Sequence, residues 1–333
     1  MLASGLEQGK RRTGGRGVSA RERSNVRGIA CMVASVFIIT LNDSLLKWLS
    51  ADYPVGQIMA IRGLFVFLPV LALARWEGGL HMLRVSRPRA QAVRAFFVVS
   101  GMFLYIGGLR FMPLADAIAI TFAGPLFSTA LAVPMLGEKV GWRRWSAVIV
   151  GLIGVTVMLR PTGEGFAWAA MLPLAAALTS GFRDIVTRRL SVSDSSSSIL
   201  GVTTLAVTCC GFLTILIPPL TGWDYWIWQP MDLAHLGVLA LCGLLLGTGQ
   251  YLMIESVRLA EIGLVSPFRY TSMLWAVLLG FIMYGTLPDH WMLTGAGLVI
   301  ASGVYILHRE TRARVLRPPA GLRPDALPLE KDG

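Results

Sequence analysis

Aspartate and arginine side chains occur inside otherwise apolar stretches of this chain. Asp43 lies in the first such stretch and Arg62 in the second. An ionised side chain in hydrocarbon costs about 2.5–3.5 kcal/mol on insertion scales, so it needs an ionic partner or a watery cavity. Tyr53 lies in the connecting turn, ten residues after Asp43 and nine before Arg62, which predicts similar depths. We favour an Asp43–Arg62 ion pair, with Lys47, four residues after Asp43, as the alternative partner.

The segment around Asp43 occurs twice. Residues 42–50 return 141 residues later as 183–191, with the acid, the basic residue four positions on and the final Leu-Ser retained, so Asp184 is the counterpart of Asp43. Two further matches, at offsets of 145 and 149, pair Leu114-Ala115-Asp116 with Leu259-Ala260-Glu261, and Trp142, Gly154 and Arg160 with Trp291, Gly303 and Arg309. Duplicated halves in an apolar chain are typical of secondary transporters, whose site lies where the halves meet.

The second copy lacks the arginine proposed as the partner in the first. Thr203 occupies that position. Arg269 lies in a later apolar stretch and could face Asp184 or the interior, while Arg183 and Arg188 could pair with Asp184 at the membrane boundary. We therefore expect the two ends of the site to be unequal.

Polar and aromatic side chains in the other apolar stretches could complete a binding pocket. Arginines would favour a carboxylate or another anion, and aspartates would favour an amine or carry a proton. Ordinary helix packing is the alternative for each residue. The candidate substrate-binding residues are Asp43, Arg62, Tyr105, Asp184, Gln250, Arg269, Tyr270 and Trp275.

Composition indicates an integral membrane protein. Hydrophobic residues form 54% of the 333 residues, charged residues 15%, and the mean hydropathy is +0.63. A span needs about 20 apolar residues, so we predict an all-α fold with ten transmembrane helices. The expected spans are 28–50, 56–75, 92–111, 114–136, 143–160, 166–189, 198–220, 234–256, 261–285 and 290–308.

Basic residues predict the orientation. Between the spans, 25 of the 30 Lys and Arg residues fall on the side of the termini and three on the other, which predicts cytoplasmic termini. Attraction to anionic lipids accounts for the net charge of +11 without nucleic acid. Five spans per copy is an odd number, so the two five-helix repeats should be inverted. The expected domains are 1–27 (basic disordered cytoplasmic tail), 28–160 and 161–308 (the repeats) and 309–333 (disordered cytoplasmic tail).

Sequence motifs for cofactor or metal chemistry are missing. The four cysteines fall in apolar runs without metal-ligand spacing, and neither HExxH nor a phosphate-binding glycine loop occurs. We therefore expect no cofactor and no enzymatic activity. Gly243, Gly247, Gly151 and Gly154 form small-residue ridges, which favour close helix packing within the chain, with a homodimer seam as the alternative.

Taken in order, several motifs resemble the drug/metabolite transporter superfamily and, within it, the ten-helix EamA-type transporters. The resemblance covers about residues 28–308. It rests on Asp43-x-x-x-Lys47, Arg62, Leu114-Ala115, Pro125, Leu136-Gly137-Glu138, Gly151 to Val155, Leu259-Ala260, Pro267-Phe268-Arg269-Tyr270, Trp275 and Gly295 to Tyr305. The chain departs from the pattern at Gly285-Thr286, which lacks the Gly-Glu of the first half, and at Arg269.

This resemblance implies a bacterial inner-membrane carrier with a central cavity that opens alternately to the two sides. Similar proteins move amino acids, vitamin-like or nucleoside-like metabolites such as riboflavin or S-adenosylmethionine, or toxic compounds. We expect a small-molecule substrate and membrane lipids as partners, with proton or counter-substrate coupling. A membrane-embedded enzyme and a channel-like or structural membrane protein are the competing functions.

Overall fold

The computed structural model describes residues 3–137, 142–159, 168–190, 195–260 and 262–315, and these contain helices, turns and loops but no strand. The α-helices are α1 (Ala3–Leu49), α2 (Val55–Glu77), α3 (Pro88–Leu109), α4 (Leu114–Thr121), α5 (Gly124–Leu136), α6 (Trp142–Leu159), α7 (Met171–Leu190), α8 (Ser196–Leu213), α9 (Ile217–Thr221), α10 (Leu233–Leu259), α11 (Ile262–Val265), α12 (Ser272–Tyr284) and α13 (His290–Val315). The all-α membrane class expected from composition agrees with this content.

Seven helical segments in the described part of the chain are long and apolar enough to cross a membrane. Two shorter apolar helices, 145–159 and 290–306, coincide with predicted spans. The expected span 261–285 is broken into α11, a 3-10 segment η5 (Ser266–Thr271) and α12. Pro267 explains this break, because proline lacks the amide hydrogen that a continuous helix needs.

The broken helices in the two halves, which correspond to the expected spans 114–136 and 261–285, end alike. Pro125 starts α5 after the break that follows α4, just as Pro267 lies at the start of η5. Gly137 ends α5 with φ +66°, and Gly285 ends α12 with φ +64°. This left-handed conformation is accessible to glycine without a Cβ clash. The two segments thus share a break and a cap, with the prolines 142 and the glycines 148 residues apart, although Glu138, the other part of this motif, lies outside the described residues.

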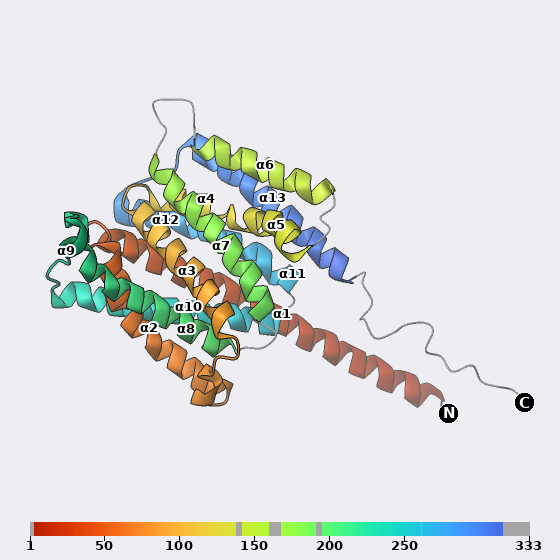
Figure 1. Cartoon of the computed structure of the whole chain (residues 1–333). Helices are drawn as coiled ribbons and strands as arrows, with labels where there is room; N and C mark the ends of the chain where they lie inside the picture. The colour runs from red at the N-terminus through yellow and green to blue at the C-terminus, as the bar shows by residue number, and fades with distance from the viewer. Residues whose placement is uncertain (1–2, 138–141, 160–167, 191–194, 261, 316–333) are drawn as a thin grey trace, which may run out of the picture.

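Helices from the two halves of the chain pack against each other. The main contacts join α1 with α10, α7 with α3, α2 with α8, and α6 with α13. Figure 1 shows α6 and α13 side by side along one edge of the bundle. Each helix of one half therefore finds its main partner in the other half.

The glycine ridges lie at these contacts. A Cβ at Gly247 would lie 2.0 Å from Pro69 Cγ, and one at Gly154 would lie 2.7 Å from the Gly295 carbonyl oxygen. The small residues thus bring α10 onto α2 and α6 onto α13 within one chain. The packing interpretation of both ridges agrees with this geometry, whereas the homodimer expectation is not tested by it.

Helices α1 and α13 extend into the segments for which disordered tails are expected. Residues 3–27 belong to α1, whose N-terminal part extends beyond the bundle in Figure 1, and α13 continues to Val315. Extending an existing helix adds one hydrogen bond per ordered residue, while a new helix must first form a costly nucleus. Polar residues next to a span can therefore continue its helix. The expected tail beyond residue 315 lies outside the described residues.

Candidate functional site

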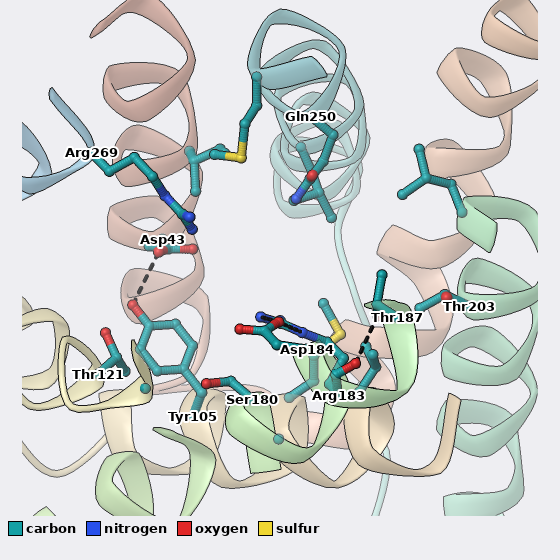
Figure 2. A pocket seen from close by; sticks show the side chains of 18 of the residues that line it. Asp43, Tyr105, Thr121, Ser180, Arg183, Asp184, Thr187, Thr203, Gln250 and Arg269 are labelled. Carbon is teal, nitrogen blue, oxygen red and sulfur yellow. Dashed lines mark hydrogen bonds and ion pairs between the residues drawn. The ribbon is translucent and has the colours of Figure 1, made fainter. Parts of the chain in front are cut away.

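A cavity of about 1230 Å³ lies between the two halves of the chain. Its lining comes from both halves, including α1, α2 and α3 on one side and α7, α8 and α10 on the other. Figure 2 shows polar side chains directed into this space. The lining is mainly apolar, and its charged members are Asp43, Arg62, Arg94, Arg183, Asp184 and Arg269.

Tyr105 is the principal partner of Asp43. Its hydroxyl donates a hydrogen bond of 3.0 Å to Asp43 Oδ2, drawn in Figure 2, and Asn42 Nδ2 donates one of 3.0 Å to Oδ1. Asp43 lies on α1 and Tyr105 on α3, so this bond joins helices that are not consecutive. The sequence identified both residues as site candidates but not their contact.

Arg62 is buried beside Asp43 without a contact ion pair. Its side chain is 2% exposed, and its Nη2 lies 3.8 Å from Met102 Sδ. Arg62 and Asp43 interact electrostatically, but no ion pair within 4.0 Å joins them in the described part of the chain. The predicted direct pair is therefore wrong, and the carboxylate instead accepts hydrogen bonds from Tyr105 and Asn42.

The alternative partner, Lys47, is also not bonded to Asp43. Its Nζ donates to the carbonyl oxygens of Leu109, at 2.9 Å, and Met112, at 2.6 Å. It also lies 5.3 Å from the centre of the Tyr284 ring. Lysine thus fastens the end of α1 to the end of α3, and we call this region the closed end of the cavity.

The cavity reaches the protein surface at the opposite end of the bundle. Trp76, near the end of α2, lines the cavity and is 72% exposed, and its ring lies edge-on to Tyr251 at 5.3 Å between centroids. Thr187 of α7 and Leu200 of α8 line the same region. We call this the open end. The cavity is therefore accessible from one side and closed by helix contacts on the other.

Asp184 pairs with its neighbour in sequence. Arg183 donates from Nε at 3.0 Å and from Nη2 at 2.7 Å, both to Asp184 Oδ1. Arg269 also interacts electrostatically with Asp184 and points into the cavity in Figure 2. Of the partners considered for Asp184, Arg183 thus forms the direct contact, and the side chain of Arg188 lies outside the described part of the structure.

Arg94 is a cavity residue that the sequence analysis missed. It was counted among the basic residues near the cytoplasmic loops, yet its side chain is 9% exposed and lines the cavity. Its Nε donates to Thr187 Oγ1 at 2.9 Å and its Nη1 donates to Thr203 Oγ1. Its place inside the predicted span 92–111 was the signal that could have identified it.

The remaining candidates divide between cavity and core. Gln250 and Tyr270 line the cavity. A Cβ at residue 303 would lie 2.0 Å from the Tyr270 hydroxyl, so Gly303 provides the space for this ring. Trp275 is not among the lining residues, because its ring packs edge-on against Phe37 at 5.0 Å.

Metal chemistry has no support in the described residues, among which no cluster of three or more His, Cys, Asp or Glu could hold an ion. The site combines a large apolar cavity with charges of both signs. Such a site can bind a small polar molecule and release it toward the open end.

Comparisons with known proteins agree with this chemistry. The model of the EamA-like transporter family matches residues 26–160 and 167–308. The S-adenosylmethionine uptake transporter of Rickettsia prowazekii is 25% identical over 87% of this chain and 96% of its own length. The riboflavin transporter of Rhizobium johnstonii is 28% identical over 89% of this chain and 95% of its own length.

Two more distant similarities extend these findings. The pseudopaline exporter CntI of Pseudomonas aeruginosa is 22% identical over 83% of this chain and 94% of its own. A crystal structure with 16% sequence identity has a TM-score of 0.58 and covers 89% of this chain and 99% of its own. At this identity the likeness concerns the fold.

Proposed function

Since the chain belongs to the EamA-like transporter family, we propose that it is a secondary carrier that moves a small polar or zwitterionic metabolite by alternating access. The curated relatives are named as transporters, which argues against an enzyme. The observation that carries the proposal is the charged cavity between the two halves, open at one end and closed at the other.

The proposed architecture is ten transmembrane helices in two inverted five-helix repeats, 28–160 and 161–308. Its support is the ordered sequence duplication, the matching breaks and glycine caps of the fourth and ninth expected spans, and the packing of helices from one half against helices of the other. Inverted repeats give two equivalent ways to close one cavity, so rocking of the halves would expose it alternately. The distribution of basic residues supports an inner-membrane location with cytoplasmic termini.

In this proposal the charged residues recognise the substrate. Asp43, held by Tyr105, binds a cationic group or a proton, and Arg62 and Arg269 bind an anionic group. The volume of about 1230 Å³ exceeds the roughly 300–1,000 Å³ of common small-molecule pockets, which leaves room for a metabolite and water. The named cargoes of the relatives, S-adenosylmethionine and riboflavin, show that such proteins accept metabolites of this size class.

A ligand screen followed by counterflow tests the function. Purified protein is heated with individual metabolites, and a ligand that binds the folded state raises the melting temperature. Hits are then loaded into proteoliposomes, where a carrier shows saturable counterflow and a channel does not. Absence of counterflow for every stabilising ligand contradicts the proposal.

Arg62 provides the residue-level test. Arg62→Ala should abolish counterflow while Arg75→Ala, which removes an exposed arginine from the same helix, should leave it unchanged. Arg62→Lys retains the charge and should retain part of the activity. A folded Arg62→Ala protein with normal counterflow would exclude the proposed role.

A further inference from the structure

The open end of the cavity contains more arginine than the transport proposal uses. Arg94, Arg183 and Arg269 line it from α3, α7 and η5, together with Asp184. Arg94 bonds Thr187, whose hydroxyl bonds the Arg183 carbonyl, and Arg183 bonds Asp184, so these three charged groups lie together, while Arg269 lines the same cavity. We call all four charged residues the open-end cluster. Figure 2 shows the three labelled members, Arg183, Asp184 and Arg269, at the cavity.

The open-end cluster has an excess of positive charge. Asp184 Oδ1 accepts both bonds from Arg183. Within the described part of the chain, no carboxylate lies within 4.0 Å of Arg94 or Arg269. Arg94 is buried, and a buried charge is stabilised by a counter-charge, while guanidinium groups match the geometry of carboxylate and phosphate. The cluster is therefore suited to an anion.

Arg94 is oriented by hydroxyl groups. Its bonds to Thr187 and Thr203 fix the guanidinium between α7 and α8, and Thr187 in turn donates to the Arg183 carbonyl at 2.7 Å. A hydroxyl positions a guanidinium without neutralising it. Arg94 thus has a fixed direction and retains its charge for a ligand.

Arg94 bonds the residue at the position where the second half lacks an arginine. Thr203 lies 141 residues after Arg62 and is therefore its counterpart in the second half. The residue 145 positions after Arg94 is Leu239, so Arg94 itself has no charged counterpart there. Near Asp43 the arginine is Arg62 of α2, whereas at the open end it is Arg94 of α3. Arg94 bonds Thr203, the residue of α8 that corresponds to Arg62. The second copy itself has no such cation, as expected, and Arg94 of the first half bonds the threonine that occupies the position.

We infer that the open-end cluster is an anion-binding subsite, in which Arg94 and Arg269 hold a carboxylate or phosphate group of the transported metabolite. The cationic or polar part of the same molecule then lies toward Asp43. This inference rests on the proposed carrier function and adds to it the direction in which a dipolar substrate lies.

Thermal unfolding in the presence of simple oxyanions tests the subsite without knowing the substrate. Purified protein is titrated with succinate or inorganic phosphate, against chloride at equal ionic strength. Both oxyanions should raise the melting temperature of the wild type saturably. Arg94→Gln and Arg269→Gln should each need at least about tenfold more oxyanion for the same shift, about 1.4 kcal/mol of binding free energy.

Matched variants separate binding from folding. Arg89→Gln removes an exposed arginine from the same helix and should respond like the wild type. Arg94→Lys retains the charge but loses the planar fork, so its response should be intermediate. If Arg94→Gln does not fold, Arg269→Gln decides alone. A wild-type response in Arg269→Gln, or a wild type that does not distinguish oxyanions from chloride, overturns the inference.

Two comparisons identify what has failed. If the wild type shows counterflow and both glutamine variants respond to oxyanions as the wild type does, the subsite is excluded and the carrier function remains. A specific oxyanion response without counterflow of any ligand excludes the carrier function and retains the anion site. Titrations repeated with added phosphatidylglycerol test the source of the anion, because loss of the succinate response there would assign the site to a lipid phosphate and overturn its assignment to the metabolite.

Discussion

Tyr105 on α3 holds Asp43 on α1 through a hydrogen bond of 3.0 Å, and this bond lies where the cavity approaches its closed end. Each residue lines the cavity from a different helix. The bond therefore couples the orientation of the acid to the position of α3.

Removal of the Tyr105 hydroxyl should impair transport more than folding. A hydrogen bond to a charged group contributes about 1.5–3 kcal/mol, so Tyr105→Phe should lower transport kcat/KM by roughly tenfold or more. Tyr305→Phe, an exposed tyrosine on α13 outside the cavity lining, is the control. The measurement is initial counterflow per folded molecule, and equal rates for the two variants would exclude a role for the Tyr105–Asp43 bond.

Lys47 should keep the closed end closed. Lys47→Met preserves the apolar stem but removes both bonds to the carbonyls of Leu109 and Met112, while Lys47→Arg retains donors. A cysteine at Thr121, in a background without native cysteines, reports access to the cavity. Lys47→Met should increase its labelling by an impermeant thiol reagent from the side opposite the open end. Labelling identical to that of Lys47→Arg would show that these bonds do not control closure.

A side chain at Gly295 should separate α13 from α6. A Cβ there would lie 2.5 Å from the Gly154 carbonyl oxygen, whereas one at Gly297 on the same helix meets nothing within 4 Å. Overpacking costs about 1–3 kcal/mol, so Gly295→Val should melt at a lower temperature than Gly297→Val. Equal melting temperatures would argue against close packing of these two helices.

Glu77 should stabilise the fold without taking part in transport. Its Oε2 accepts from the Ser197 amide at 3.1 Å and the Ser197 hydroxyl at 2.5 Å, at the start of α8. An acid at a helix N-terminus is favourable, so Glu77→Gln should cost about 1 kcal/mol of stability. Glu255→Gln, which weakens only a 3.9 Å pair with Arg258, is the matched control. Equal melting temperatures for the two variants would contradict this role, and loss of counterflow per folded Glu77→Gln molecule would show a transport role instead.

Local sequence was sufficient to predict the membrane class, most helices and most of the cavity residues. Hydrophobic runs identify helices because each must satisfy its own backbone hydrogen bonds in lipid. Ionisable residues within those runs indicate the site because their burial is costly. Seven of the eight candidate residues line the cavity, whereas Trp275, chosen for its aromatic ring, packs in the core.

Only the tertiary structure decided which of these residues meet. The Lys47 ammonium group bonds carbonyls 62 and 65 residues later in the chain, and Arg94 bonds Thr203, 109 residues later. Sequence spacing measures depth along a helix, but contact depends on which faces of non-consecutive helices are turned toward each other. That rotation depends on how small residues pack between helices, such as Gly247 against Pro69. The linear sequence does not show these contacts, because they form only when the helices come together.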